Sequence, residues 1–452
     1  MTTQIRRVTG RRVWDSRGRP TIEAEVALDG GAVGRAIAPA GASMGSGEAI
    51  DLRDGGVSFG GLDVRQAVEH VNREIAAMLV GWDAADQKGV DQALVTLDGT
   101  SQKSRLGGNA IVAVSMAVLH AAAAASRRPL WSYLAGEDPV RIPLPEIQIF
   151  GGGAHAGQRV DIQDFLVVCP SAGSIAEALD RTAEVHRAAG KLLQESGRLA
   201  GVADEGGWWP VFDTNEGALD WLTRAIGKAG FTPGDEVSIA LDIAASEFGR
   251  GGRYRLGLEG RELDRDGLAE LLLGWVDRYP IVSIEDPFGE DDPEGFRRFT
   301  AAVGKRVQVV GDDLLVTRAE RVTAAARKGL VTCVLIKPNQ AGTVTETRAA
   351  LEAARRSGLA AIISARSGES EDITVSHLAV GWNVGQIKVG SITRGERTAK
   401  WNELLRIEEV LGAQASFAGA SALRPLGRLK TGLAKSLVEN PADDERSAKD
   451  RE

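Results

Sequence analysis

The sequence of 452 residues lacks several features that would place it in other protein classes. No stretch approaches about 18 consecutive apolar residues, so we predict no membrane-spanning helix. The first residues, MTTQIRRV, contain no apolar segment and therefore predict no secretory signal. The net charge is −8 and no long basic run occurs, which argues against nucleic acid as a partner.

Cysteine is also scarce, with two in the whole chain. Cys169 and Cys333 each lie in an apolar, strand-like run. We therefore expect buried free thiols and a cytoplasmic protein. Hydrophobic residues make up 43% of the chain, enough for two or three domains or for a barrel with a smaller partner.

Residues 1–135 are predicted to form an N-terminal α+β capping domain. Apolar and polar residues alternate from Thr21 to Leu28, which indicates a half-exposed strand. Residues 65–80 and 108–126 have helical spacing. The glycine-rich segment from Gly41 to Gly47 is either an ordinary connector or a mobile flap.

Residues 140–418 alternate short apolar runs with amphipathic segments, and residues 419–452 are expected to form a frayed polar tail. Repeated strand–helix units of this length predict a parallel (β/α) barrel. The expected strands are Phe165–Cys169, Ser238–Asp242, Ile281–Glu285, Val307–Gly311, Cys333–Lys337, Ala361–Ser364 and Gln386–Val389. The expected helices are 174–194, 216–229, 266–276, 318–328 and 343–357.

Three successive predicted strands end in a carboxylate: Asp242, Glu285 and Asp312. Any one of them alone would most often be a solvated loop side chain. Three acids that converge at a barrel mouth, however, cannot all be ionised without a cation. Oxygen ligands without histidine or cysteine favour Mg²⁺.

The next strands end in Lys337 and Lys388. A lysine at a strand end can simply extend to solvent, but barrel active sites also lie at this end. Two ammonium groups beside a divalent cation repel each other, which we expect to lower the pKa of the more buried one. A neutral lysine beside a metal ion suits removal of a proton α to a carboxylate.

The sequence resembles the enolase (phosphopyruvate hydratase) family from Val13 to about Gly419, and the arrangement of metal and lysine base is known for that superfamily. The resemblance implies an enolase-type (β/α)8 barrel with an N-terminal α+β cap. The matching motifs include VWDSRGRP at 13–20, GAS at 41–43, DEGG at 204–207, SIEDP at 283–287, GDDL at 311–314, LIKPNQ at 335–340 and ERTAKWN at 396–402.

The resemblance assigns two Mg²⁺ ions to the site. Asp242, Glu285 and Asp312 match the ligands of a tightly bound ion. Ser43 matches a flap residue that ligates a second ion when the flap closes. The substrate implied is a small phosphorylated carboxylate, and the implied assembly is a homodimer or larger homo-oligomer.

Catalytic roles follow from the same resemblance. Lys337 matches the base that takes the C2 proton of 2-phosphoglycerate, and Lys388 matches the lysine at the substrate carboxylate. Glu205 matches the acid that helps the C3 hydroxyl leave, and His155 matches a loop histidine that closes over the substrate. Asp164 stands near the leaving hydroxyl, where the family has glutamate.

Further departures from the family cluster around the substrate. Arg366 and Ser367 match the phosphate-binding pair, but Ala365 precedes them where the family has histidine. Ala154 replaces a serine in the histidine loop. Together with Asp164, these changes reduce side-chain volume and predict a pocket that admits a larger group.

Three functions are compatible with this pattern. The first is Mg²⁺-dependent dehydration of 2-phosphoglycerate to phosphoenolpyruvate. The second resembles carboxyphosphonoenolpyruvate synthase of phosphonate antibiotic biosynthesis, which takes a nucleotide-linked phosphonoformate; the altered pocket and an Ala- and Arg-rich composition typical of GC-rich genomes motivate it. The third is a non-catalytic binding protein, against which the retained lysines and Glu205 argue.

Overall fold

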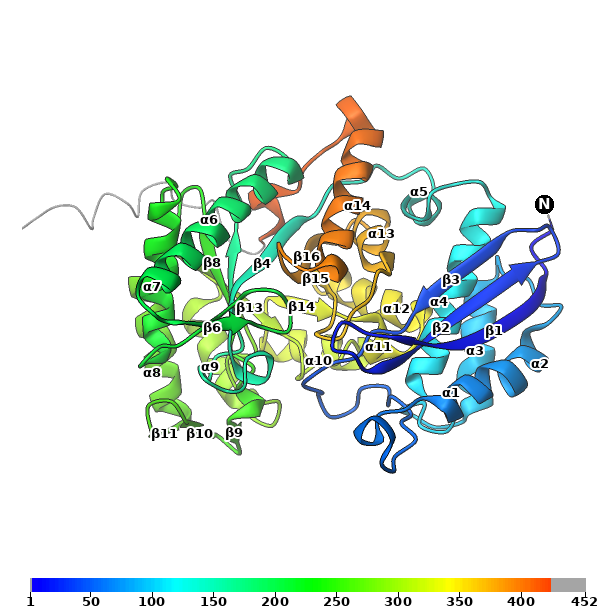
Figure 1. Cartoon of the computed structure of the whole chain (residues 1–452), viewed down its shortest axis with the longest axis horizontal. Helices are drawn as coiled ribbons and strands as arrows, with labels where there is room; N and C mark the ends of the chain where they lie inside the picture. The colour runs from blue at the N-terminus through cyan, green and yellow to red at the C-terminus, as the bar shows by residue number, and fades with distance from the viewer. Residues whose placement is uncertain (1, 424–452) are drawn as a thin grey trace, which may run out of the picture.

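The computed structural model describes residues 2–423 and contains a small N-terminal domain beside a barrel (Figure 1). The N-terminal domain begins with an antiparallel sheet in the order β1-β2-β3. Its strands are β1 (Ile5–Trp14), β2 (Pro20–Leu28) and β3 (Val33–Ile37). Its helices are α1 (Arg65–His70), α2 (Ala76–Leu79), α3 (Gln87–Asp98), α4 (Gly108–Ala125) and α5 (Leu130–Ala135). The predicted α+β capping domain is therefore confirmed as a fold class.

Helix α4 forms the centre of the cap. By length and hydropathy it could cross a membrane, yet 89% of it is buried inside the protein. It packs against β2 and β3, and its side chains are apolar on almost every face. The Cβ that a side chain at Gly34 would add lies 2.2 Å from the Ala121 backbone, so glycine permits this close approach. The apolar character of α4 thus serves the core of the domain.

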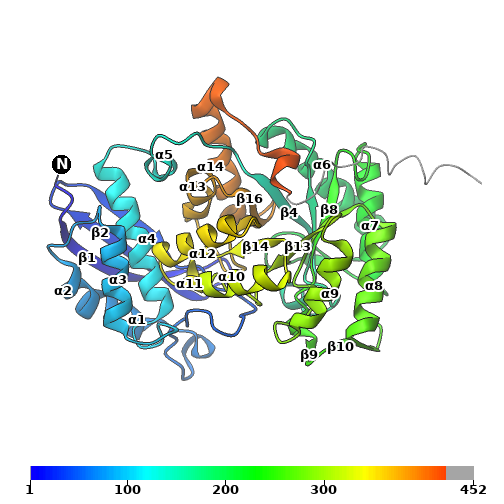
Figure 2. The same cartoon turned by 180° about the vertical axis from the view of Figure 1, so that it is seen from behind.

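The second domain is a closed barrel, seen from both sides in Figures 1 and 2. Among the described residues, eight strands form a ring, because β16 pairs with both β15 and β4. These strands are β4 (Leu144–Gly151), β5 (Asp164–Val168), β8 (Ser238–Asp242), β12 (Ile281–Glu285), β13 (Gln308–Gly311), β14 (Cys333–Ile336), β15 (Ala360–Ser364) and β16 (Gly385–Ser391).

Helices surround the ring, two further strands extend its sheet beside β4, and three others form a small separate sheet. The helices are α6 (Ile175–Glu195), α7 (Asn215–Lys228), α8 (Arg265–Arg278), α9 (Pro293–Val303), α10 (Ala319–Lys328), α11 (Pro338–Ala341), α12 (Val344–Arg356), α13 (Thr374–Gly381) and α14 (Gly395–Leu411). The additional strands are β6 (Leu199–Val202) and β7 (Trp208–Pro210), then β9 (Gly249–Arg250), β10 (Arg253–Leu256) and β11 (Arg261–Asp264).

The expectation of an entirely parallel barrel is wrong for one strand. β5 runs antiparallel to both of its neighbours, β4 and β8. The segment between β4 and β5 contains only a short 3₁₀ turn, Gly153–His155, and no crossover helix. A parallel connection needs a crossover of a dozen or more residues, usually a helix, so the chain returns as a hairpin here. The first residue of β5, Asp164, therefore lies at the same end of the barrel as the last residues of the parallel strands.

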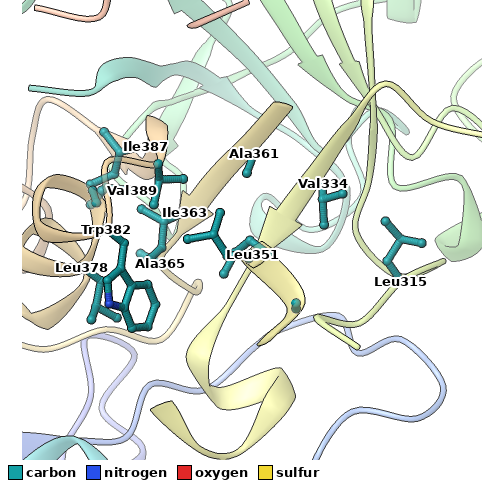
Figure 3. Packing of buried hydrophobic residues seen from close by; sticks show 14 of the residues in the cluster. Leu315, Val334, Leu351, Ala361, Ile363, Ala365, Leu378, Trp382, Ile387 and Val389 are labelled. Atoms are coloured by element: carbon teal, nitrogen blue, oxygen red, sulfur yellow. The ribbon is translucent and has the colours of Figure 1, made fainter. Parts of the chain in front are cut away.

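The core lies between the barrel strands and the surrounding helices. Figure 3 shows Ile363 and Ile387 on adjacent strands, facing Leu378 and Trp382 of the α13 region. Residues at alternate strand positions are buried in this layer, and those between them face the barrel interior. Polar side chains that face inward are thus carried on a scaffold fixed by apolar packing on the outside.

The boundary expected at residue 419 is placed too early. Gly419–Ala422 form a 3₁₀ turn, and the amide of Ala420 donates to the carbonyl of Pro170 at 2.9 Å. Leu423 is fully buried in the cluster that contains Leu144. The remainder of the expected tail, residues 424–452, lies outside the described part of the chain.

The burial of His186 makes stability depend on pH. The ring of this α6 residue stacks on Trp208 with centroids 4.6 Å apart, and burial lowers its pKa to about 4. In the unfolded chain its pKa is about 6.5, so the unfolded state binds more protons between these values. We predict that His186 alone removes about 1–2 kcal/mol of unfolding free energy as the pH falls from 7.5 to 5.

Urea unfolding at both pH values measures this loss. His186→Gln should show a smaller decrease between pH 7.5 and 5 than the parent chain, whatever its stability at pH 7.5. An equal decrease in the two proteins would contradict a neutral buried imidazole.

Candidate active site

A small pocket opens at the barrel mouth, where the cap segment around Ser43 approaches the strand ends. Nearly all of the side chains around it come from the strand ends and the loops that follow them. They are Ala42, Ser43, His155, Gln163, Asp164, Glu205, Asp242, Lys337, Ser364, Ala365, Arg366, Ser367, Lys388 and Val389. Nine of the eleven site residues predicted from the sequence, all but Glu285 and Asp312, therefore border one cavity, and these two contact its lysines.

Lys388 of β16 lies between two of the predicted metal ligands. Its Nζ donates to Asp242 Oδ2 at 2.7 Å and to Glu285 Oε2 at 2.8 Å. Asp242 and Glu285 are adjacent because their Cα atoms pair in the parallel register of β8 and β12. Burial opposes the charge of Lys388, but these two carboxylates and Asp164 raise its pKa well above the ordinary value. The ammonium group thus holds two acids together that would otherwise repel each other.

Lys337 makes the corresponding pair with the third predicted ligand. Its Nζ donates to Asp312 Oδ2, while Gln340 Nε2 donates to Asp312 Oδ1 at 2.8 Å. Although burial disfavours the charge, the Asp312 carboxylate raises the pKa of Lys337 above the ordinary value. Without a divalent cation, each ammonium thus has a carboxylate partner that outweighs the effect of burial, and the lowered lysine pKa expected beside a metal ion stays a prediction.

The carboxylates offer a suitable environment for a hard divalent cation. Oε1 of Glu285 is buried without a hydrogen-bond partner among the described residues. Burial and the neighbouring Asp242 carboxylate raise the pKa of Glu285 well above its usual range. Asp312 also lies beside Asp286 and Asp313, with one carboxylate oxygen of each within 4.8 Å of the others. Oxygen donors with unbalanced negative charge fit Mg²⁺, so the residues present are compatible with the ion.

His155 and Asp164 form an ion pair in the same pocket, and Asp164 Oδ2 lies 3.7 Å from Lys388 Nζ. Nδ1 of His155 lies 2.9 Å from Asp164 Oδ1, and Nε2 lies 3.7 Å from Glu205 Oε1. Burial opposes the charge, but the two carboxylates raise the pKa of His155 to about 9. Despite burial, His155 lowers the pKa of Asp164 to about 2. At neutral pH the imidazolium can therefore donate a proton or a hydrogen bond inside the pocket.

Arg366, expected to bind phosphate, is held by the cap. Nη1 donates to Glu48 Oε2 at 2.9 Å and to Asn339 Oδ1 at 3.1 Å, and Nη2 donates to the Ser43 carbonyl at 2.9 Å. Glu48 also accepts from the amide of Gly45 at 3.0 Å, inside the glycine-rich segment. That segment is thereby attached to the barrel arginine. The side chain of Ser43 borders the pocket, but no contact of its hydroxyl with the predicted metal ligands is observed among residues 2–423.

Sequence analysis did not single out several supporting residues. Gln148 Nε2 donates to Asp164, and its Oε1 accepts from the Gly207 amide at 2.8 Å. Arg397 is fully buried and donates to the carbonyls of Arg366 and Val389 at 2.6 and 2.9 Å. The arginine lies in the ERTAKWN motif, which could have identified it, whereas nothing local marks Gln148.

The two parts of the chain match known domains in the same order. Residues 5–134 match the model of the enolase N-terminal domain, and residues 139–426 match that of the enolase C-terminal TIM barrel domain. The chain is 47% identical over 417 residues to Enolase 1 of Desulfitobacterium hafniense (strain Y51). The aligned region covers 92% of this chain and 95% of that protein. With both domains matched over nearly the whole length, the chain belongs to the enolase family of lyases.

Proposed function

We propose that the protein dehydrates 2-phosphoglycerate to phosphoenolpyruvate with the help of Mg²⁺. One observation carries the proposal: the ammonium groups of Lys337 and Lys388 both contact acids at one barrel mouth. The same pocket contains the protonated His155 beside Glu205. A base, a carboxylate-binding cation and an acid around one cavity suit the removal of water across a carbon–carbon bond.

Asp242, Glu285 and Asp312 would hold one Mg²⁺, and Ser43 would contribute to a second. Bound there, the cation supplies positive charge beside the substrate carboxylate, where negative charge develops when C2 loses its proton. With a cation held there, Asp312 would support the ammonium of Lys337 less strongly. The amine of Lys337 would then be available as the base that accepts the proton from C2.

The other residues bind and orient the substrate. Lys388 pairs with the substrate carboxylate, and Arg366 with Ser367 binds the phosphate. Glu205 helps the C3 hydroxyl to leave as water, while His155 donates a hydrogen bond and shields the pocket from solvent. Asp164 keeps the imidazole charged and fixes its orientation through Nδ1.

Phosphonoformyl transfer has less support than dehydration. The 47% identity to a protein named as an enolase favours ordinary enolase chemistry. Ala365 borders the pocket and also belongs to the hydrophobic cluster that contains Leu378 (Figure 3), so a small residue there is no sign of a larger substrate by itself. We therefore propose a small phosphorylated carboxylate as substrate, a homodimer or larger homo-oligomer as assembly, and the cytoplasm as location.

The role of Lys337 can be measured without dehydration. In deuterated water with Mg²⁺ and 2-phosphoglycerate, Lys337→Ala should lower C2 proton exchange by at least about a hundredfold, because general base catalysis contributes that much. Lys328, exposed at the end of α10, provides a control: Lys328→Ala should exchange at the parent rate. Exchange that persists in Lys337→Ala, with circular dichroism unchanged, would exclude Lys337 as the base.

Ala365→His tests whether the altered pocket limits dehydration. A histidine there places a polar group beside the phosphate-binding residues, and a hydrogen bond to a charged group is worth about 1.5–3 kcal/mol. We expect kcat/KM for 2-phosphoglycerate, followed by ultraviolet absorbance of the enol product, to rise about tenfold. Ala365→Leu, which adds volume without polarity, should give no gain. Equal rates in both variants would show that position 365 does not limit the reaction.

A further inference from the structure

A buried carboxylate lies in the barrel interior, outside the lining of the pocket and not among the predicted metal ligands. Glu146 occupies the middle of β4, and its Cα pairs with that of Lys388 on β16 in parallel register. Its strand neighbour Ile147 packs in the outer core, whereas Leu144 belongs to the cluster inside the barrel. Glu146 therefore projects into the barrel on the same face as Lys388.

The carboxyl group of Glu146 is enclosed but incompletely bonded. The residue is 2% exposed, and its Oε1 has no hydrogen-bond partner among residues 2–423. The ion pairs of Lys388 go to Asp164, Asp242 and Glu285 instead. An apolar side chain of similar size would fit this position without the cost of burying a charge.

The environment nevertheless permits ionisation near neutral pH. Burial raises the pKa of Glu146 to about 7, and the charge of Lys388 and the hydroxyl of Ser283 limit that rise. Ser283 in turn accepts from Gln308 Nε2 at 3.1 Å. Above pH 7 the barrel interior thus carries a negative charge on the residue that pairs with Lys388 across β4 and β16.

We propose that Glu146 is a positioning residue that acts through Lys388 and balances cation binding against substrate binding. Its charge keeps the ammonium group near the barrel floor when Asp242 and Glu285 turn to a divalent cation. The same charge attracts that cation and repels the carboxylate of an anionic substrate. This inference rests on the proposed function for the identity of the substrate only.

Loss of the Glu146 charge should weaken cation binding and strengthen substrate binding. These opposite changes distinguish the proposed role from structural damage. At pH 8, where Glu146 is ionised, Glu146→Gln should raise the Kd for Mg²⁺ about three- to tenfold. The same substitution should lower KM for 2-phosphoglycerate about threefold at saturating Mg²⁺. Calorimetric titration of the metal-stripped full chain gives the first value, and steady-state kinetics give the second. A looser barrel would instead weaken both.

Two further variants serve as controls. Glu146→Asp keeps the charge and should bind Mg²⁺ within about twofold of the parent chain. Gln308→Met removes an uncharged polar side chain that is equally buried in the barrel interior. This variant should not show the combination of a higher Kd for Mg²⁺ and a lower KM for 2-phosphoglycerate. If Glu146→Gln does not fold, Glu146→Met, which also removes the charge, provides the same measurement.

The proposed role of Glu146 would be overturned if Glu146→Gln or Glu146→Met left both the Kd for Mg²⁺ and the KM for 2-phosphoglycerate unchanged. It would also be overturned if both constants rose. The Mg²⁺ measurement needs no turnover. A chain that binds Mg²⁺ with the predicted dependence on Glu146 but never dehydrates 2-phosphoglycerate would therefore refute the proposed function alone.

Discussion

The contact of Lys388 with Asp242 and Glu285 is the interaction on which the site depends. Parallel pairing of β8 and β12 places the two carboxylates side by side, and both are buried. Without a cation between them, at least one would have to bind a proton. The lysine supplies that cation from within the chain, so the mouth can keep a dense group of acids in a folded and ordered state.

The turns that follow these strands are strained, which fixes the positions of the acids. Ala244, two residues after Asp242, has φ 47°, and Asp286, directly after Glu285, has φ 38°. Such conformations cost of the order of 1–3 kcal/mol each for residues other than glycine. They are offset by local hydrogen bonds: the Ala244 amide donates to Asp242 Oδ1 at 3.1 Å, and Asp286 accepts from the amides of Asp312 and Asp313. The acids are consequently held in place by the backbone itself.

Features that depend on where a strand ends could be predicted from the sequence. Features that depend on contacts between distant residues could be predicted less well. Lys337 directly follows the apolar run Cys333–Ile336, and Lys388 lies near the end of a predicted strand, so both were predicted at the mouth. The direction of β5, and with it the position of Asp164, depends on the missing crossover helix after β4. The raised lysine pKa values depend on distances between side chains of different strands, which no local pattern encodes.

The contact between Glu48 and Arg366 links the cap to the chemistry of the barrel. Arg366 already donates to Glu48, Asn339 and the Ser43 carbonyl, and its charge is therefore partly balanced before any phosphate arrives. A dianionic phosphate must compete with Glu48 for the guanidinium group. Because Glu48 also holds the amide of Gly45, any weakening of its bond to Arg366 loosens the glycine-rich segment that carries Ser43. If Arg366 binds phosphate as proposed, one carboxylate, that of Glu48, connects the phosphate site of the barrel to the glycine-rich segment of the cap.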